Sequence, residues 1–191
     1  MNYSRKIKTV FFTLLLVGTT TVFAQSKVKS EKTVMVGGAA MYPSKNIVAN
    51  AVNSKDHTTL VAAVKAAGLV ETLQSEGPFT VFAPTNSAFD KLPEGTVATL
   101  LKPENLKMLQ TILTYHVVAG NYKAADIMTL VKKNNGKATF KTVSGGELTA
   151  TMKGKNLMLT DANGNMATVT IANVNQSNGV IHVIDTVVLP K

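Results

Sequence analysis

Three histidines are the side chains best suited to metal binding or proton transfer in this 191-residue sequence: His57, His116 and His182. Zinc sites usually draw several ligands from closely spaced positions, as in His-Glu-x-x-His or paired cysteines. The histidines here are far apart along the chain, and the sequence contains no cysteine. The sequence therefore predicts no metal site and no cofactor. We interpret His182, between Ile181 and Val183, as a hydrogen-bonded imidazole within a buried strand.

The motifs of nucleophilic catalysis are missing as well. A serine hydrolase typically carries Gly-x-Ser-x-Gly at a turn from strand to helix, and no such pentapeptide occurs. Glycine-rich phosphate loops are also absent. The 11 acidic residues are scattered without a recognisable pair, although folding can bring distant carboxylates together. We therefore expect a protein that is not an enzyme.

The charge of the chain favours acidic partners over nucleic acid. The formal net charge is +9, and lysines gather at positions 132, 133, 137 and 141. Proteins that bind nucleic acid usually interleave such lysines with aromatic side chains and use arginine to read base edges. This chain has no tryptophan, and its one arginine is Arg5. The lysines are thus interpreted as solvated loop residues that favour an acidic glycan or an anionic cell surface.

The N-terminus has the features of a secretory signal peptide. Residues 5–8 are basic, residues 10–17 are apolar, and a small-x-small motif ends at Ala24. The apolar stretch is much shorter than the ~20 residues that span a bilayer, and no cysteine is available for lipid attachment. We predict a signal peptide over 1–24, cleavage after Ala24, and a secreted protein, periplasmic or extracellular, without stable membrane insertion. Loss of three basic residues would lower the net charge to +6.

The rest of the chain is expected to form one domain, acting as a monomer. Residues 25–43 are basic and then rich in glycine and alanine, which predicts a flexible lead in which 33–36 pairs loosely as an edge strand. Residues 44–190 have the length of a single domain. The sequence is 45% hydrophobic and 16% charged, as is typical of an ordered globular protein. Without cysteine, the domain must be stabilised by its core alone.

The first half of this domain is predicted to be helical. Helical periodicity or capping signals mark a short turn and three helices, at residues 85–89, 58–67, 104–115 and 124–130. Asp56 is the expected N-cap of the helix that begins at Thr58, and Gly68 is its expected end. Thr85 can cap the short turn, Pro103 suits the first turn of the longest helix, and Asp126 lies in the first turn of the last.

The second half is predicted to be a meander of strands. Strand signals cover residues 138–143, 147–152, 157–161, 166–172 and 180–189, and an earlier strand covers 79–83. Ser144-Gly145-Gly146 and Asn163-Gly164 are strong hairpin turns. The final strand is nearly all apolar, as expected for a strand buried on both faces. Helices followed by a meander indicate an α+β fold with a mainly antiparallel sheet.

Two apolar blocks give this chain a resemblance to a known family. Residues 77–89 (GPFTVFAPTNSAF) and 178–190 (NGVIHVIDTVVLP), with Tyr115-His116 between them, resemble the motif blocks and Tyr-His segment of the fasciclin (FAS1, beta-Ig-H3) family. The resemblance implies a twisted sheet or wedge-shaped sandwich with helices packed along one side. It also implies a single-domain bacterial-type adhesion or extracellular matrix module that binds a cell-surface or matrix protein or polysaccharide.

The same resemblance indicates a candidate partner-binding site at Tyr115, His116, Asn121 and Tyr122. In the family, the Tyr-His segment is associated with receptor or matrix adhesion, and its histidine with organising the core. A histidine at a helix C-terminus can also bond to free carbonyls and favour the negative end of the dipole, which is a purely structural role. Residues 119–122 depart from the Pro-Gly of many relatives, and no Arg-Gly-Asp tripeptide is present.

A small-ligand carrier is the alternative function. It would use a cleft between the helices and the sheet, lined by Met108, Met128, Met152 or Met158. Methionine more often fills irregular gaps in a core than lines a binding site. An open apolar cavity would favour the carrier, and a closed dry core would favour the adhesion module.

Overall fold

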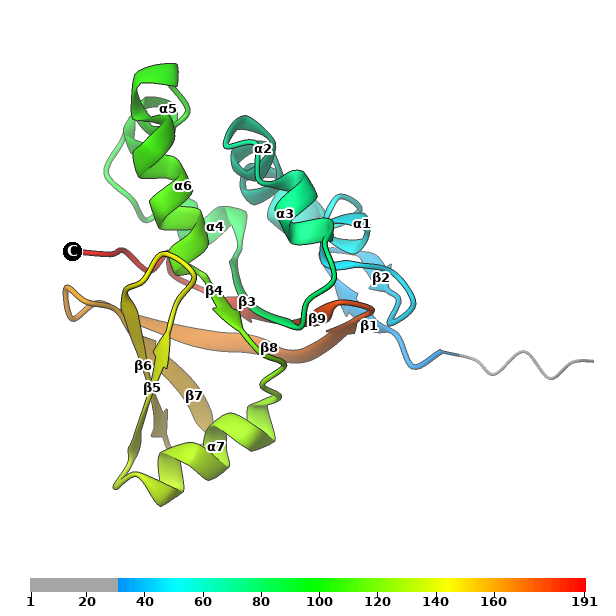
Figure 1. Ribbon diagram of the computed structural model, residues 1–191, viewed down its shortest axis with the longest axis vertical. Coiled ribbons are helices and arrows are strands. Elements are labelled where there is room, and N and C mark those ends of the chain that lie inside the picture. Colours follow the sequence, from blue (N-terminus) through cyan, green and yellow to red (C-terminus); the bar gives the residue numbers. More distant parts are fainter. Residues whose placement is uncertain (1–30) are drawn as a thin grey trace, which may run out of the picture. The chain divides into compact units, whose positions relative to one another are not determined.

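The computed structural model describes residues 31–191, which are built around a seven-stranded sheet (Figure 1). The predicted signal peptide lies outside the described residues. The strand order is β4-β3-β9-β8-β7-β6-β5, and every neighbouring pair is antiparallel except β3 and β9. The strands are β3 (Phe79–Pro84), β4 (Val117–Ala119), β5 (Lys137–Lys141), β6 (Glu147–Lys153), β7 (Asn156–Thr160), β8 (Met166–Gln176) and β9 (Gly179–Ile184). The predicted α+β fold with a mainly antiparallel sheet is confirmed.

The two apolar blocks lie side by side as the second and third strands of this sheet. Strands β3 and β9 pair in parallel, from Phe79 beside Gly179 to Pro84 beside Ile184. Strand β9 is buried along its whole length, as the apolar sequence predicted. It ends at Ile184 rather than at Leu189, because the chain then leaves the sheet and packs Val187 among the helices. Segments about a hundred positions apart in the sequence thus pair directly and contribute residues to two of the hydrophobic clusters.

The sheet nearly closes on itself at one end. The edge strands β4 and β5 meet through a bridge between Val118 and Thr142, and the Val143 amide donates to the Val117 carbonyl at 2.8 Å. The long strand β8 pairs with β7 near its start and with β9 along the rest of its length (Figure 1). Its pairing with β9 shifts register twice. These bulges let one long strand bend and serve both halves of the sheet.

Six helices lie near β3, β4 and β9, whereas α7 packs against β5 and β6 at the other end (Figure 1). The helices are α1 (Ile47–Ala51), α2 (Thr58–Ala66), α3 (Val70–Gln74), α4 (Asn86–Phe89), α5 (Thr96–Leu100), α6 (Leu106–Tyr115) and α7 (Ala124–Lys133). Short 3₁₀ turns at Lys55–His57 and Pro103–Asn105 precede α2 and α6. None of the helices in the described part of the chain is long and apolar enough to cross a bilayer.

Most of the predicted helix ends are confirmed. Thr85 caps α4 by accepting from the Ala88 amide, and Gly68 takes a φ of +68° just after α2. Asp126 accepts from the Lys123 amide at 3.0 Å at the start of α7. The prediction for Asp56 is wrong: it lies inside a 3₁₀ turn, one residue too early to reach the free amides of α2.

The lead segment is ordered over residues 34–41, in contrast to the flexible lead expected for 25–43. Strands β1 (Val34–Val36) and β2 (Ala39–Met41) form an antiparallel hairpin around Gly37-Gly38, whose φ angles are +56° and +77°. Two positive φ angles give the tight turn that suits a two-residue hairpin. The buried side chains of Val36 and Met41 then pack into the core formed by α1, β3 and β9.

Candidate functional site: the loop between β4 and α7

Tyr115 lies in the interior, where it joins three parts of the fold. Its side chain is 0% exposed, and its hydroxyl donates to the Glu147 carbonyl at 2.5 Å. The same oxygen accepts from the Ala162 amide at 3.0 Å, so α6 is tied to β6 and to the turn after β7. Gly146 lies against the ring, where a Cβ atom would be 2.7 Å away. Burial raises the pKa of the Tyr115 hydroxyl.

His116 is also an interior residue, with 3% of its surface exposed. Its Nδ1 donates to the Ile112 carbonyl at 2.8 Å, which confirms the predicted bond to a free carbonyl at the end of α6. Its Nε2 accepts from the Val188 amide at 3.2 Å. Burial lowers the pKa of His116 to about 4, so the ring is neutral near pH 7 and stabilises the helix end through hydrogen bonds rather than charge.

The structure therefore separates the four residues that the sequence analysis grouped together. Tyr115 and His116 are buried, so their side chains make their contacts within the domain and do not lie on its surface. Asn121 is exposed and Tyr122 is half-buried, in the loop that connects β4 to α7. The surface part of the candidate site is this loop, residues 120–123, which we call the Tyr122 loop.

Strand β3 holds the first half of the Tyr122 loop through the hydroxyl of Thr80. This hydroxyl donates to the Gly120 carbonyl at 2.7 Å and accepts from the Tyr122 amide at 2.9 Å. The Gly120 amide in turn donates to the Pro78 carbonyl at 2.8 Å. Three backbone groups of an exposed loop are thus bonded to residues in or beside β3, which restricts the conformations that the loop can adopt.

Two further side chains hold the second half of the loop. The Nε2 of His182 donates to the Tyr122 carbonyl at 2.9 Å, and its ring stacks on Phe82 with centroids 5.7 Å apart. His182 is thus a buried, hydrogen-bonded imidazole, as predicted, and burial lowers its pKa. Asn173, at a bulge of β8 with a φ of +60°, accepts from the Ala124 amide at 2.8 Å and so caps α7.

The ring of Tyr122 is held in a defined position on the surface. It meets Phe140 edge to face, with ring centroids 5.1 Å apart. It also covers Gly120, whose φ is +112° and where an added Cβ would lie 2.6 Å from the ring. Glycine is required at this position, because a side chain would both strain the backbone and displace the tyrosine.

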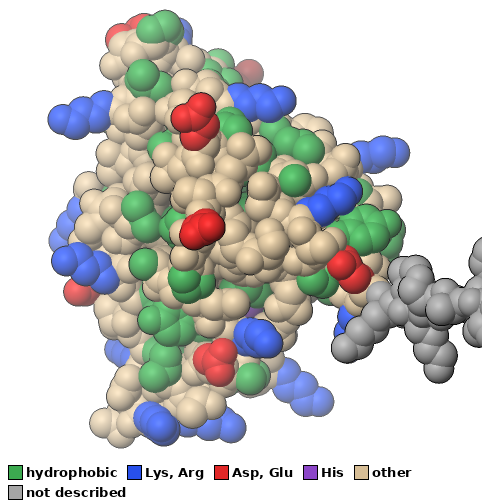
Figure 2. Space-filling view, turned by 45° about the vertical axis from the view of Figure 1, so that its right-hand side comes forward, with side chains coloured by type: hydrophobic (Ala, Val, Ile, Leu, Met, Phe, Trp, Pro, Cys, Tyr) green, Lys and Arg blue, Asp and Glu red, His purple; other side chains and the backbone are tan. Residues whose placement is uncertain are grey.

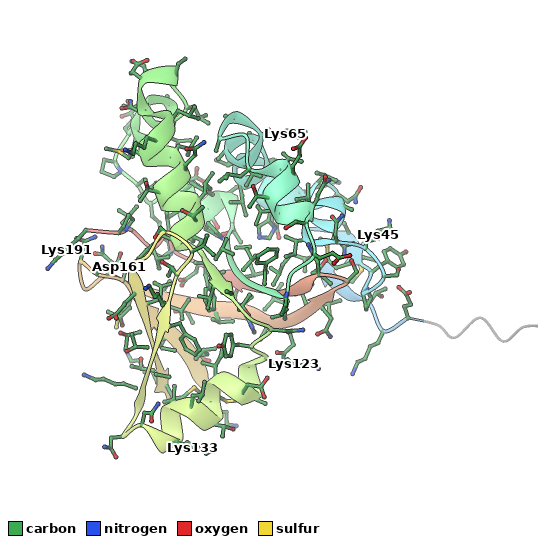
Figure 3. All side chains as sticks on the ribbon, viewed as in Figure 1. Lys45, Lys65, Lys123, Lys133, Asp161 and Lys191 are labelled. Atoms are coloured by element: carbon green, nitrogen blue, oxygen red, sulfur yellow. The ribbon has the colours of Figure 1, made fainter. Side chains whose placement is uncertain are left out.

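A groove of about 450 Å³ opens beside Tyr122, between the diverging edges of β4 and β5. Its floor includes Leu130 of α7, and its rim includes Ala119 and Lys141. Exposed lysines continue along α7 and β5, at Lys123, Lys132, Lys133, Lys137 and Lys141. Figure 2 shows several lysine side chains at the bottom of the view, where α7 lies in Figure 1. In Figure 3, Lys123 and Lys133 mark the two ends of α7.

These lysines lack acidic partners. Within residues 31–191 one ion pair has a nitrogen–oxygen distance below 4 Å. It joins Lys91 to Asp185 at 3.9 Å and lies away from the groove. The surface around the groove therefore keeps its positive charge. No group of three or more potential metal ligands occurs in the part of the chain that the structure describes.

The four methionines named for the carrier hypothesis do not share one cleft. Met108 is 58% exposed on α6, and Met158 is buried within the sheet. Met128 of α7 and Met152 of β6 line a depression between this helix and the sheet, separate from the groove beside Tyr122. This depression thus involves two of the four residues.

Sequence reasoning missed Thr80 and Asn173, two of the three side chains that hold the Tyr122 loop from below. Thr80 is β-branched within an apolar strand, so it was indistinguishable from a core residue. Asn173 left a signal, because the predicted strand stopped at Ala172, immediately before it. An asparagine that interrupts a strand is a candidate for positive φ and for a bulge.

Comparison with known proteins agrees with this architecture. The model of the fasciclin domain matches residues 55–190. Protein sll1483 from Synechocystis sp. is 46% identical over 173 residues, which cover 91% of this chain and 89% of that protein. The cell surface glycolipoprotein MPB83 from Mycobacterium bovis is 35% identical over 160 residues, which cover 81% of this chain and 64% of MPB83.

A solved structure shows the same fold. It is a FAS1 domain pair from the insect cell adhesion molecule fasciclin I, with a TM-score of 0.55 and 23% sequence identity. The match covers 72% of this chain and 45% of the domain pair. The paired motif blocks, the buried Tyr-His segment and these matches show that this chain belongs to the fasciclin domain family.

Proposed function

We propose that this protein is an exported, non-enzymatic adhesion or matrix module that binds an acidic component of a cell surface or extracellular matrix. The binding surface is the Tyr122 loop together with the adjacent groove and the lysines of α7 and β5. The observation that carries this proposal is the hydrogen-bonded support of the loop by Thr80, His182 and Asn173. These three side chains fix an exposed segment from beneath.

A loop fixed in advance loses little conformational entropy when a partner binds, so more of the contact energy appears as affinity. Tyrosine is enriched at interfaces because one ring supplies both apolar area and a polar group. Tyr122 presents such a ring, half-buried and held against Phe140. Exposed Asn121 and Lys123 flank it with hydrogen-bonding groups.

The charge around the loop supports an acidic partner, such as an anionic polysaccharide. Unpaired lysines on α7 and β5 would speed association and favour partners of opposite charge. The names of two related proteins, a cell surface glycolipoprotein and a cell adhesion molecule, are in keeping with a role outside the cytoplasm.

Export is expected to remove residues 1–24. If the full sequence is expressed in a secretion-competent bacterium, protein recovered outside the cytoplasm should begin at Gln25, because the small-x-small motif ends at Ala24. Intact-mass measurement of this material tests the cleavage site. A mass that still includes Met1 or Asn2 would contradict the signal peptide.

Binding should depend strongly on Tyr122. We expect Tyr122→Ala to weaken binding to immobilised alginate, an acidic polysaccharide, or to intact bacterial cells by ~10-fold or more, as for a central aromatic contact. Lys65→Ala, on the exposed face of α2, removes one positive charge far from the loop and from the α7 lysines and should change affinity less than twofold. Binding should also weaken as salt is raised from ~0.05 to ~0.5 M. Equal affinities for both variants would contradict the proposed surface.

Thr80→Val provides a matched test of the support beneath the loop. Valine keeps the shape of threonine but removes the hydroxyl that bonds Gly120 and Tyr122, at a cost of ~1 to 3 kcal/mol in stability. The variant should bind more weakly although every exposed side chain is unchanged.

Turnover of any substrate at ~1 per second or faster by the wild type would overturn the non-enzymatic proposal.

A further inference from the structure

A second surface feature is an open depression of about 470 Å³ beside the C-terminal half of α7, which we call the Met128 depression. It is lined from α7 by Met128, Val131 and Lys132, and from β6 and the turn that follows it by Met152 and Lys155. Sites that bind small molecules typically have volumes of ~300 to 1,000 Å³. The depression is therefore large enough for a small ligand that stays partly exposed to solvent.

The floor of this depression is apolar. Met128 and Met152 are both half-buried, and Val131 lies three positions after Met128, on the same face of α7. Met152 also packs against the largest hydrophobic cluster, so the core supports the floor from beneath. Methionine side chains are flexible and polarisable and adapt to the shape of an apolar partner. The floor thus offers contacts that suit an alkyl chain.

The surroundings of the floor carry positive charge. Five exposed lysines lie at this end of the domain, namely Lys132, Lys133, Lys137, Lys153 and Lys155. Glu147 is the one acidic residue in the sequence between positions 127 and 160. It begins β6, whereas Lys153 ends this strand, so about 20 Å of extended chain separates the two. The apolar floor therefore lies among cations that no neighbouring carboxylate on these segments neutralises.

The dipole of α7 accounts for only part of this charge. Lys132 and Lys133 lie in the last turn of the helix, where cations offset the partial negative charge of the free carbonyls. Lys153 and Lys155 lie in a tight hairpin turn between two strands, where no helix ends. Their charge is thus in excess, on the opposite side of the apolar floor from Lys132. An occupant that satisfies both features carries an alkyl chain and a negative charge.

We propose that the Met128 depression binds a single-chain anionic amphiphile, a short alkyl chain that ends in a carboxylate. The chain lies on Met128, Val131 and Met152, and the carboxylate lies between the ammonium groups of Lys132 and Lys155. A neutral apolar molecule would leave the lysines unused, and a polysaccharide would leave the methionines unused. The site excludes Tyr122 and its groove, and it does not depend on the proposed adhesion function.

Three small probes separate the contributions of charge and chain. We expect octanoate, below its aggregation concentration at pH 7, to shift the methyl NMR signals of Met128 and Met152 saturably. Met108, 58% exposed on α6, serves as the internal reference and should not shift. Octylammonium has the same chain and the opposite charge, so it should bind at least tenfold more weakly. Hexanoate should bind about four- to fifteenfold more weakly than octanoate, because each buried methylene contributes about fourfold in affinity.

Several outcomes would overturn this proposal. One is equal affinity for octanoate and octylammonium, and another is the absence of saturable octanoate binding. Equal shifts at Met108 and Met128 would show non-specific association of the alkyl chain with any exposed methionine. Cosedimentation with phosphatidylglycerol vesicles in the absence of octanoate binding would assign the lysines to a membrane surface instead.

Matched substitutions then locate the site. Met128→Gln keeps the side-chain length and the helix propensity but removes the apolar contact, and it should weaken octanoate binding about fivefold or more. Met108→Gln makes the same change on α6 and should have no effect. Lys155→Gln should weaken binding about threefold, as for an exposed ion pair, whereas Lys65→Gln on α2 should not. Tyr122→Ala should leave octanoate binding unchanged, which distinguishes this site from the adhesion surface. Unchanged octanoate affinity in Met128→Gln would contradict the assigned floor.

Discussion

Replacing Phe82 with alanine is expected to lower the free energy of unfolding by ~3 to 5 kcal/mol. Phe82 is 1% exposed on strand β3, where it belongs to the largest hydrophobic cluster and stacks on His182. Its removal leaves a cavity and also frees the imidazole that holds the Tyr122 carbonyl. Ile184 is 0% exposed on β9 and belongs to the same cluster. Truncating it to alanine should lower the free energy of unfolding by ~2 to 5 kcal/mol.

Urea unfolding followed by circular dichroism measures both losses. Leu106→Ala is the matched control, because Leu106 is a large apolar residue on α6 that is 40% exposed and should cost well under ~1 kcal/mol. Typical domains have a total stability of ~5 to 15 kcal/mol, so the core variants can be largely unfolded at 37 °C. If both core variants match Leu106→Ala, the central role of the β3–β9 pair is wrong.

The pairing of β3 and β9 was predictable in kind but not in detail. Both blocks were recognisable from their apolar runs and turn residues, and the resemblance to fasciclin domains implied that they share a sheet. Their parallel register, with Phe79 beside Gly179, was not predictable because apolar runs buried on both faces lack the alternation that fixes register. Gly179 itself shows why the register is tight, since an added Cβ would lie 2.0 Å from the Phe79 carbonyl oxygen.

The candidate site was only half accessible to sequence reasoning. Tyr115 and His116 were found together with Asn121 and Tyr122, but sequence proximity could not reveal that the chain passes from the core to the surface between these pairs. The supporting bonds to Thr80, Asn173 and His182 come from strands up to 60 positions away from the loop. Such long-range polar contacts leave little trace in local patterns, whereas helix caps such as Thr85, which act within three residues, were predicted correctly.

The hairpin of β1 and β2 illustrates the opposite error. Its glycine- and alanine-rich sequence was interpreted as a flexible lead because the interpretation relied on composition and not on the spacing of its apolar residues around the glycines. The positions that decide the outcome are Val36, just before the Gly37-Gly38 turn, and Met41, at the end of β2, which both reach the core beside Ile47. Two buried apolar anchors are enough to order a short hairpin when a neighbouring sheet and helix supply the surface on which it packs.

Lowering the pH from 7 to about 4.5 is expected to destabilise the protein substantially, because its three histidines are all buried in neutral form. Burial lowers the pKa of His116 to about 4 from an ordinary value of 6.5, and it also lowers the pKa of His57 and of His182. Between these two pKa values the unfolded chain binds a proton at His116 that the folded chain does not. The free energy of unfolding therefore falls as the pH falls through this window.

The size of the effect follows from the shift. At ~1.4 kcal/mol per pKa unit, His116 alone accounts for about 3 kcal/mol between pH 6.5 and 4, with the other two histidines acting in the same direction. Above pH 7 all three are neutral in both states, so they contribute no pH dependence there. Urea midpoints at pH 7.5, 6.5, 5.5 and 4.5 should decline mainly below pH 6.5, while carboxylates remain largely ionised.

His116→Gln is the variant that isolates this contribution. Glutamine does not titrate, so the variant should be less stable at pH 7.5, where the bonds to Ile112 and Val188 are disturbed, yet lose less stability than wild type between pH 6.5 and 4.5. The two pH profiles should therefore converge on the acid side. Should wild type keep its urea midpoint down to pH 4.5, the neutral, buried state of these histidines would be refuted, because a neutral buried imidazole must lose stability when the unfolded chain gains a proton.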